Sequence, residues 1–194
     1  MYDQAIKLSW PAEDYATFQI AMLAGVRSAN EKISGMNTMI RKFPKSPLAI
    51  DANMEIANTY MGNEKEALRQ YKFIVDRYPS SAEAEDALDN IKTIYVEDGK
   101  PDEYAAYMRQ IGKPLSADTE DELTWAAAEK LYDDQKLNEA LNAYNSYIQR
   151  FPSGAHVLEA NFNRAEIYNT RKDWNNAVVA FEAVAAQAPN PFAE

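Results

Sequence analysis

Phe151-Pro152 is one copy of a signal that returns along the chain and decides its fold. The same aromatic-proline pair occurs at Phe43-Pro44 and Tyr78-Pro79. With Pro11, Pro114 and Pro189 added, consecutive prolines are separated by 33, 35, 35, 38 and 37 residues. A regular period in this range is typical of stacked repeats, in which one unit cannot bury its apolar face alone.

Apolar residues between the prolines recur at helical spacing, as in Ala67, Leu68, Tyr71, Ile74 and Val75. We therefore predict an all-α fold, a right-handed α-α superhelix (a solenoid of helix-turn-helix hairpins), with about ten full helices and no sheet. The predicted units are residues 1–10 (partial), 11–45 (unit 1, degenerate), 46–79 (unit 2), 80–115 (unit 3, degenerate), 116–152 (unit 4), 153–189 (unit 5) and 190–194 (the start of a further unit).

Composition restricts the partners. The chain has 194 residues and a net charge of −10, from 30 acidic and 20 basic side chains. A nucleic-acid partner requires Lys and Arg to neutralise phosphates, so we predict no nucleic-acid binding. No apolar run approaches the roughly 20 residues that span a bilayer, so we predict no membrane insertion. The absence of cysteine excludes disulfides and Cys-ligated zinc.

The repeat pattern resembles the tetratricopeptide repeat over essentially the whole chain. The clearest unit is the fifth, which has the family's small and aromatic residues at Ala165, Tyr168, Trp174, Ala177 and Phe181, followed by the closing Pro189. The fourth matches at Ala128, Leu131, Leu137, Ala140, Tyr144 and Pro152. The resemblance implies a non-catalytic scaffold that binds a protein or peptide on the concave face lined by the first helix of each unit.

A finer resemblance lies in the segments after two of the prolines. Phe43-Pro44-Lys45-Ser46 precedes Asp51-Ala52, and Tyr78-Pro79-Ser80-Ser81 precedes Asp86-Ala87. These segments resemble repeats of bacterial cell-envelope proteins, such as the outer-membrane assembly lipoprotein and the Tol-Pal-associated periplasmic protein. The resemblance implies a periplasmic or outer-membrane-associated protein, with a cytoplasmic one as the alternative.

The family register implies which residues line the concave face. It places there Asp51, Met54 and Asn58 from the second unit, Glu122, Trp125 and Glu129 from the fourth, and Glu159, Phe162 and Glu166 from the fifth. One interpretation is that these are simply solvated helix residues. The other is a groove with apolar side chains rimmed by carboxylates, which suits an extended or helical segment that is neutral or basic.

No residues indicate catalysis, a metal or a cofactor. His156 and Glu159 are three apart on a predicted helix, but two ligands make no site, and we interpret His156 as part of a solvated helix start. A single histidine supports no Ser/His/Asp set. We therefore predict no enzyme activity, no cofactor and no metal.

Two functions remain open from the sequence. The first is a fragment of a longer scaffold that docks partners, possibly in envelope assembly. The second is a spacer or regulatory array attached to a catalytic or signalling domain outside this segment. The pattern also predicts weak end-to-end self-association, because residues 2–9 have the pattern of a helix tail, Phe192 begins a further unit, and the 173–188 helix carries Val178 and Val179.

Overall fold

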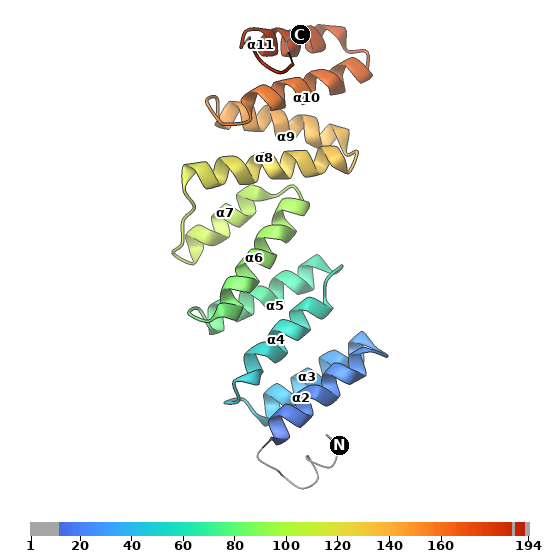
Figure 1. The fold of residues 1–194 in the computed structure, drawn as a ribbon, viewed down its shortest axis with the longest axis vertical. Helices are drawn as coiled ribbons and strands as arrows, with labels where there is room; N and C mark the ends of the chain where they lie inside the picture. The colour runs from blue at the N-terminus through green and yellow to red at the C-terminus, as the bar shows by residue number, and fades with distance from the viewer. Residues whose placement is uncertain (1–11, 188, 193–194) are drawn as a thin grey trace. The chain divides into compact units, whose positions relative to one another are not determined.

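The computed structural model describes residues 12–187 and 189–192, which form ten α-helices and no strand (Figure 1). The helices are α2 (Glu13–Gly25), α3 (Ala29–Lys42), α4 (Leu48–Thr59), α5 (Glu64–Arg77), α6 (Ala82–Glu97), α7 (Pro101–Gln110), α8 (Ala117–Asp133), α9 (Leu137–Arg150), α10 (Val157–Thr170) and α11 (Trp174–Ala185). The all-helical prediction is confirmed. The predicted helix tail at residues 2–9 lies outside the described residues.

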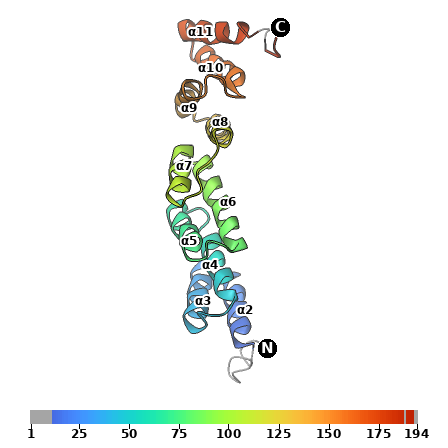
Figure 2. The same cartoon turned by 90° about the vertical axis from the view of Figure 1, so that its left-hand side faces the viewer.

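The chain divides into two compact parts, residues 1–94 and 95–194. In the first part, helix α2 packs on α3, α3 on α4 and α4 on α5, while α4 also contacts α2. First and second helices of the hairpins therefore form two layers, with α2 and α4 on one side and α3 and α5 on the other (Figure 2).

The core of the first part lies between these layers. It contains Ala21, Met36, Met39, Ala52 and Ile56, all of which are buried. Small residues permit the close approach of α2 and α3, because a Cβ added at Gly35 would lie 2.6 Å from the Cβ of Ala21. Such a distance leaves no room for a larger side chain at either position.

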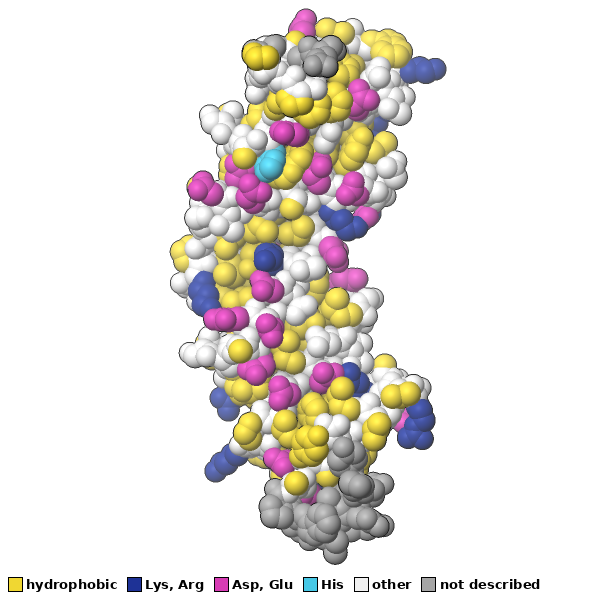
Figure 3. All heavy atoms as spheres, in the orientation of Figure 1, with side chains coloured by type: hydrophobic (Ala, Val, Ile, Leu, Met, Phe, Trp, Pro, Cys, Tyr) yellow, Lys and Arg dark blue, Asp and Glu magenta, His cyan; other side chains and the backbone are white. Residues whose placement is uncertain are grey.

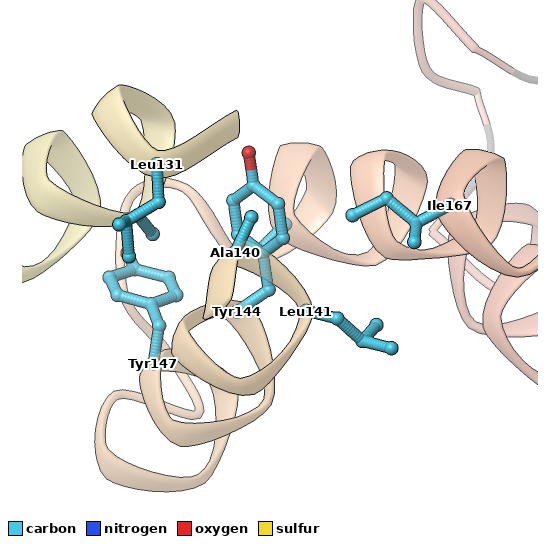
Figure 4. Packing of buried hydrophobic residues seen from close by; sticks show 8 residues of the cluster. Leu131, Ala140, Leu141, Tyr144, Tyr147 and Ile167 are labelled. Carbon is cyan, nitrogen blue, oxygen red and sulfur yellow. The ribbon is translucent and has the colours of Figure 1, made fainter. Parts of the chain in front are cut away.

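The core of the second part repeats this arrangement with aromatic residues. Tyr144 and Tyr147 of α9 are fully buried, and Leu141 on the same helix faces Ile167 of α10 (Figure 4). The four alanines predicted to lie between paired helices are buried, with exposures of 0% for Ala128, Ala140 and Ala165 and 4% for Ala177. Outside the core, Arg150 of α9 pairs with Asp102 of α7 and Glu120 of α8.

Side-chain caps begin several of the helices. Asn63 accepts a hydrogen bond from the backbone N–H of Glu66 at the start of α5. Thr119 and Glu122 have the spacing of a capping box, but this pattern does not begin α8. Ser116 is the N-cap of α8 and accepts from the N–H of Thr119 at 3.1 Å, so this helix begins earlier.

Four of the five hairpin turns share one left-handed residue, and the turn between α2 and α3 lacks it. Gly62 and Gly99 have φ values of +91° and +68°, and at the same position the last two turns have Gln135 and Lys172, at +59° and +60°. Each lies five residues before the residue of the second helix that packs against the first helix. These four turns therefore share one backbone conformation at this position although only two of the four residues are glycine.

Candidate partner-binding face

A Thr or Asn marks one position on four of the first helices and fixes their common register. The side chains of Thr17, Asn53, Thr124 and Asn161 each donate to the backbone carbonyl four residues earlier, at 2.8, 2.7, 2.7 and 2.8 Å. Each lies four residues before a buried alanine, respectively Ala21, Ala57, Ala128 and Ala165. These local bonds satisfy polar side chains at sites packed against other helices.

Helix α4 carries the first predicted set. Asp51 and Met54 are half-buried, whereas Asn58 is exposed and its side-chain oxygen accepts a hydrogen bond from the Tyr71 hydroxyl at 2.7 Å. Spacings of three and four residues place the three side chains along one side of the helix.

The surroundings of Asp51 are unfavourable for a negative charge. Burial raises the pKa of its carboxyl, and the nearby carboxylates of Glu83 and Glu55 raise the pKa further. Lys32 pairs with Glu55, at 2.5 Å between Nζ and Oε2, and among the described residues no Lys or Arg forms an ion pair with Asp51. A cation that approaches Asp51 would therefore compensate an existing electrostatic cost.

Helix α8 carries the second set, and its central residue is already in contact with a ring. The imidazole of His156 stacks on the indole of Trp125, with centroids 4.7 Å apart and planes 7° apart. The Nε2 atom of His156 lies 3.2 and 3.3 Å from the two carboxylate oxygens of Glu122. The single histidine is visible among carboxylate side chains in Figure 3.

His156 is therefore more than the solvated helix start that the sequence suggested. Its side chain is only 25% exposed, and its backbone N–H donates to the Tyr147 hydroxyl at 3.0 Å. Its partner is Glu122 of α8 rather than Glu159 of its own helix. In the part of the chain that the structure describes, no three His, Cys, Asp or Glu residues are arranged to hold a metal ion.

Glu129, the third residue of this set, joins three helices. It accepts hydrogen bonds from the Tyr144 hydroxyl and from Nδ2 of Asn163, the latter at 2.9 Å. Burial raises the pKa of the Tyr144 hydroxyl, and the bond to Glu129 raises the pKa further. This carboxylate therefore stabilises the packing of α8, α9 and α10.

Helix α10 carries the third set. The ring of Phe162 stacks on Phe192, with centroids 4.3 Å apart, and meets Phe181 edge-on at 6.3 Å. Glu159 has a buried Oε2 atom with no hydrogen-bond partner among the described residues. Glu166 lies beside Ile167 at a shallow pocket of about 130 Å³.

The segment that follows each closing proline, up to the first turn of the next helix, supplies the contacts that sequence reasoning missed. His156 is four residues after Pro152, Glu83 is four after Pro79, and Phe192 is three after Pro189. Each contacts or approaches a residue of the preceding first helix, respectively Trp125, Asp51 and Phe162. The proline period combined with an offset of three or four residues is the signal that could have identified them.

The structure brings together the three residues of each set, because each set lies on one helix. It also joins the second and third sets through the bond between Glu129 of α8 and Asn163 of α10.

Among the described helices, none is long and apolar enough to cross a membrane.

A family model describes one segment of the chain. Residues 159–191 match the tetratricopeptide repeat, which confirms the predicted repeat type for these residues, whereas the envelope resemblance stays a prediction. No curated protein sequence matches the chain.

Several solved structures have a similar chain path. The tetratricopeptide protein YrrB, described as having an unusual peptide-binding site, is 15% identical with a TM-score of 0.44, covering 100% of this chain and 95% of that one. MamA is 14% identical with a TM-score of 0.41, covering 88% and 91%. A tetratricopeptide protein from Parabacteroides merdae is 14% identical with a TM-score of 0.40, covering 98% and 68%.

Proposed function

We propose that this chain is a non-catalytic scaffold that binds a neutral or basic segment of a partner protein, and that the face of α4 is its main contact. The main support is Asp51, a half-buried carboxylate near those of Glu83 and Glu55. Among the described residues, no Lys or Arg forms an ion pair with it. A Lys or Arg from the partner would supply the missing charge.

The neighbouring side chains give this site an apolar component. Met54 is half-buried one helical turn from Asp51, and a flexible thioether adapts to varied apolar surfaces. Asn58, one turn further, is exposed and retains its amide N–H₂ as a donor for a peptide carbonyl. The arrangement suits a segment in which a basic residue is followed by an apolar one.

The other two sets support a secondary role. Trp125 and Phe162 are each already covered on one side by a ring of the chain itself, His156 and Phe192 respectively. Glu122 and Glu129 already have hydrogen-bonding partners. Asp51 on α4 is therefore the carboxylate in the three sets that would gain most from a positively charged partner.

The test measures binding of immobilised peptides that share an apolar core and differ only in a Lys, Gln or Glu at one end. The Lys peptide should bind best, and its affinity should fall as salt rises. Asp51→Asn should remove the preference for Lys over Gln. Asp76→Asn on α5, where the carboxylate is exposed, is the matched control and should leave the preference intact.

Preferential binding of the Glu peptide, or a preference for Lys that survives Asp51→Asn, would reject the site. Met54→Ala should weaken all three peptides to a similar degree, because it removes an apolar contact and no charge. Phe73→Ala, which alters an exposed apolar side chain on α5, controls for loss of surface hydrophobicity.

We also propose that the scaffold acts in the bacterial envelope, in the periplasm or at the outer membrane. The support is the resemblance of the segments after Pro44 and Pro79 to envelope repeats. Osmotic-shock fractionation of the native cells with an antibody to the chain tests this location, and recovery in the cytoplasmic fraction would contradict it.

A further inference from the structure

Helix α11 exposes an apolar face. Trp174, Val178 and Val179 are 57%, 54% and 59% exposed, whereas Ala177 and Ala180 on the opposite side are buried. Trp174 and Val178 are one turn apart on the helix and Val179 adjoins Val178, so the three exposed side chains are neighbours rather than scattered surface residues.

The preceding hairpin shows what covers this position. Val178 follows the buried Ala177 as Leu141 follows the buried Ala140. Leu141 is only 9% exposed, because α10 packs on α9 and places Ile167 against it (Figure 4). The apolar side chain at this position is thus covered by the first helix of a hairpin of the same type.

Helix α2 exposes the complementary side chain. Leu23 lies two residues after the buried Ala21, as Ile167 lies two residues after the buried Ala165. Ile167 is 2% exposed, whereas Leu23 is 59% exposed, and Val26 one turn further is 83% exposed. Val178 and Leu23 therefore occupy the positions of Leu141 and Ile167, but they lie at separate sites on the chain and both are exposed.

The same alignment of the helices also places two polar residues, Gln19 and Glu166, at the positions of a hydrogen-bonded pair in the preceding hairpins. Asn163, two residues before Ala165, donates from Nδ2 to Glu129, which follows Ala128. Gln19 occupies the position of Asn163 on α2, and Glu166 occupies the position of Glu129 on α10. When α2 is placed on α11 as α10 lies on α9, Gln19 becomes a donor to Glu166.

We propose that α2 of a second copy of this chain packs on α11 of the first, with Leu23 against Val178 and Gln19 bonded to Glu166. The two surfaces of this contact differ, so it is heterologous and propagates head to tail. The argument for a second copy is that this chain itself supplies both the apolar and the polar half at matching positions. The proposal is independent of the peptide site on α4.

A contact made by one helix against a hairpin is small, so the association is expected to be weak, with Kd between about 10 µM and about 1 mM. The test is sedimentation velocity of the 194-residue chain over this concentration range. Val178→Asp blocks the α11 surface and Leu23→Asp blocks the α2 surface, while Phe73→Asp on α5 is the control. Circular dichroism confirms that each variant retains its helices.

The wild type and Phe73→Asp should associate progressively, and each blocked variant alone should stay monomeric. An equimolar mixture of the two blocked variants should form a dimer and nothing larger, because one intact surface of each kind remains. Gln19→Ala should weaken the wild-type association several-fold.

A wild type that is monomeric up to about 1 mM would overturn the proposal and leave the face for a different protein. Self-association of the Leu23→Asp variant equal to that of the wild type would also overturn it, because α11 would then pair with itself.

Discussion

The hydroxyl of Tyr144 donates a hydrogen bond to the carboxylate of Glu129, so that a fully buried phenol on α9 holds a charged group on α8. Asn163 of α10 donates to the same carboxylate at 2.9 Å and lies 3.2 Å from the phenol oxygen. One small polar network thus joins three successive helices inside an otherwise apolar contact. Networks of this kind favour one packing register, because an altered register leaves buried polar groups unpaired.

Tyr144→Phe removes the donor and keeps the ring. We expect it to cost about 1–2 kcal/mol of unfolding free energy, because the half-buried Glu129 loses a charge-assisted bond while retaining the one from Asn163. Urea denaturation measures the change. Tyr78→Phe, at a half-buried ring outside this network, is the control, and equal effects of the two substitutions would contradict a structural role for the network.

Alkaline pH should destabilise the second part of the chain. Burial raises the pKa of the Tyr144 and Tyr147 hydroxyls, and the bonded carboxylates of Glu129 and Asp121 raise it further. The unfolded phenols titrate near about 10, so above that pH the unfolded chain binds fewer protons than the folded one and stability falls. This contribution is fully present below about pH 10. The double variant Tyr144→Phe, Tyr147→Phe should lose less stability than the wild type between about pH 9 and about pH 11 in thermal melts, and parallel losses would contradict the assignment.

Gly154→Ala should destabilise the turn between α9 and α10. An added Cβ would lie 2.6 Å from the Tyr147 hydroxyl oxygen and 2.8 Å from a carboxylate oxygen of Asp121. The turn must shift and weaken the bond between these groups, at a cost of about 1–3 kcal/mol. Ser153→Ala, at the exposed neighbouring position, should be close to neutral in the same denaturation assay.

Ala140→Leu tests the close contact of paired helices. Ala140 is fully buried between α8 and α9, so a larger side chain should overpack the contact and cost about 1–3 kcal/mol. Glu139→Leu places the same side chain at the adjacent exposed position and controls for the change in composition. An unchanged unfolding midpoint for Ala140→Leu would show that the helices separate without cost.

Asp51→Asn should stabilise the fold while weakening partner binding. A carboxyl with a raised folded pKa favours the neutral state, so its contribution to stability is present below the unfolded pKa and lost as pH rises through the folded pKa. Asparagine stays neutral at every pH. We expect a gain below about 1 kcal/mol near pH 7, because the carboxyl is still partly solvated, and no gain below about pH 4. A loss of stability at pH 7 would contradict the unfavourable charge at Asp51.

The proline period and the paired alanines predicted the fold from sequence because both act locally. A proline is disfavoured inside a helix and so marks a helix boundary, and Ala140 or Ala177 permits close packing with whichever first helix precedes it. The sequence pattern does not locate the start of α8, because Ser116 and Thr119 are both competent caps. The choice between them depends on where the chain leaves its extended conformation, which the sequence does not show.

The candidate site was less predictable than the fold. Helical register alone gave the face on which Asp51, Trp125 and Phe162 lie. Their burial and neighbours depend on the segment after the next proline, which brings Glu83, His156 or Phe192 to them from 30 to 32 residues further along the chain. The right-handed twist of successive hairpins stays a prediction.

The left-handed turn residues Gln135 and Lys172 provide a way to measure that twist. They occupy the same position in adjacent turns, are exposed, and direct a side chain outward where the earlier turns have glycine. Because the chain contains no cysteine, thiols introduced at these two positions would be the only sites for attaching a pair of spin labels. The mean distance between the labels would depend on the angle between the two hairpins, and the width of the distance distribution would report how much that angle varies. These two positions therefore allow the bending of the repeat array to be measured.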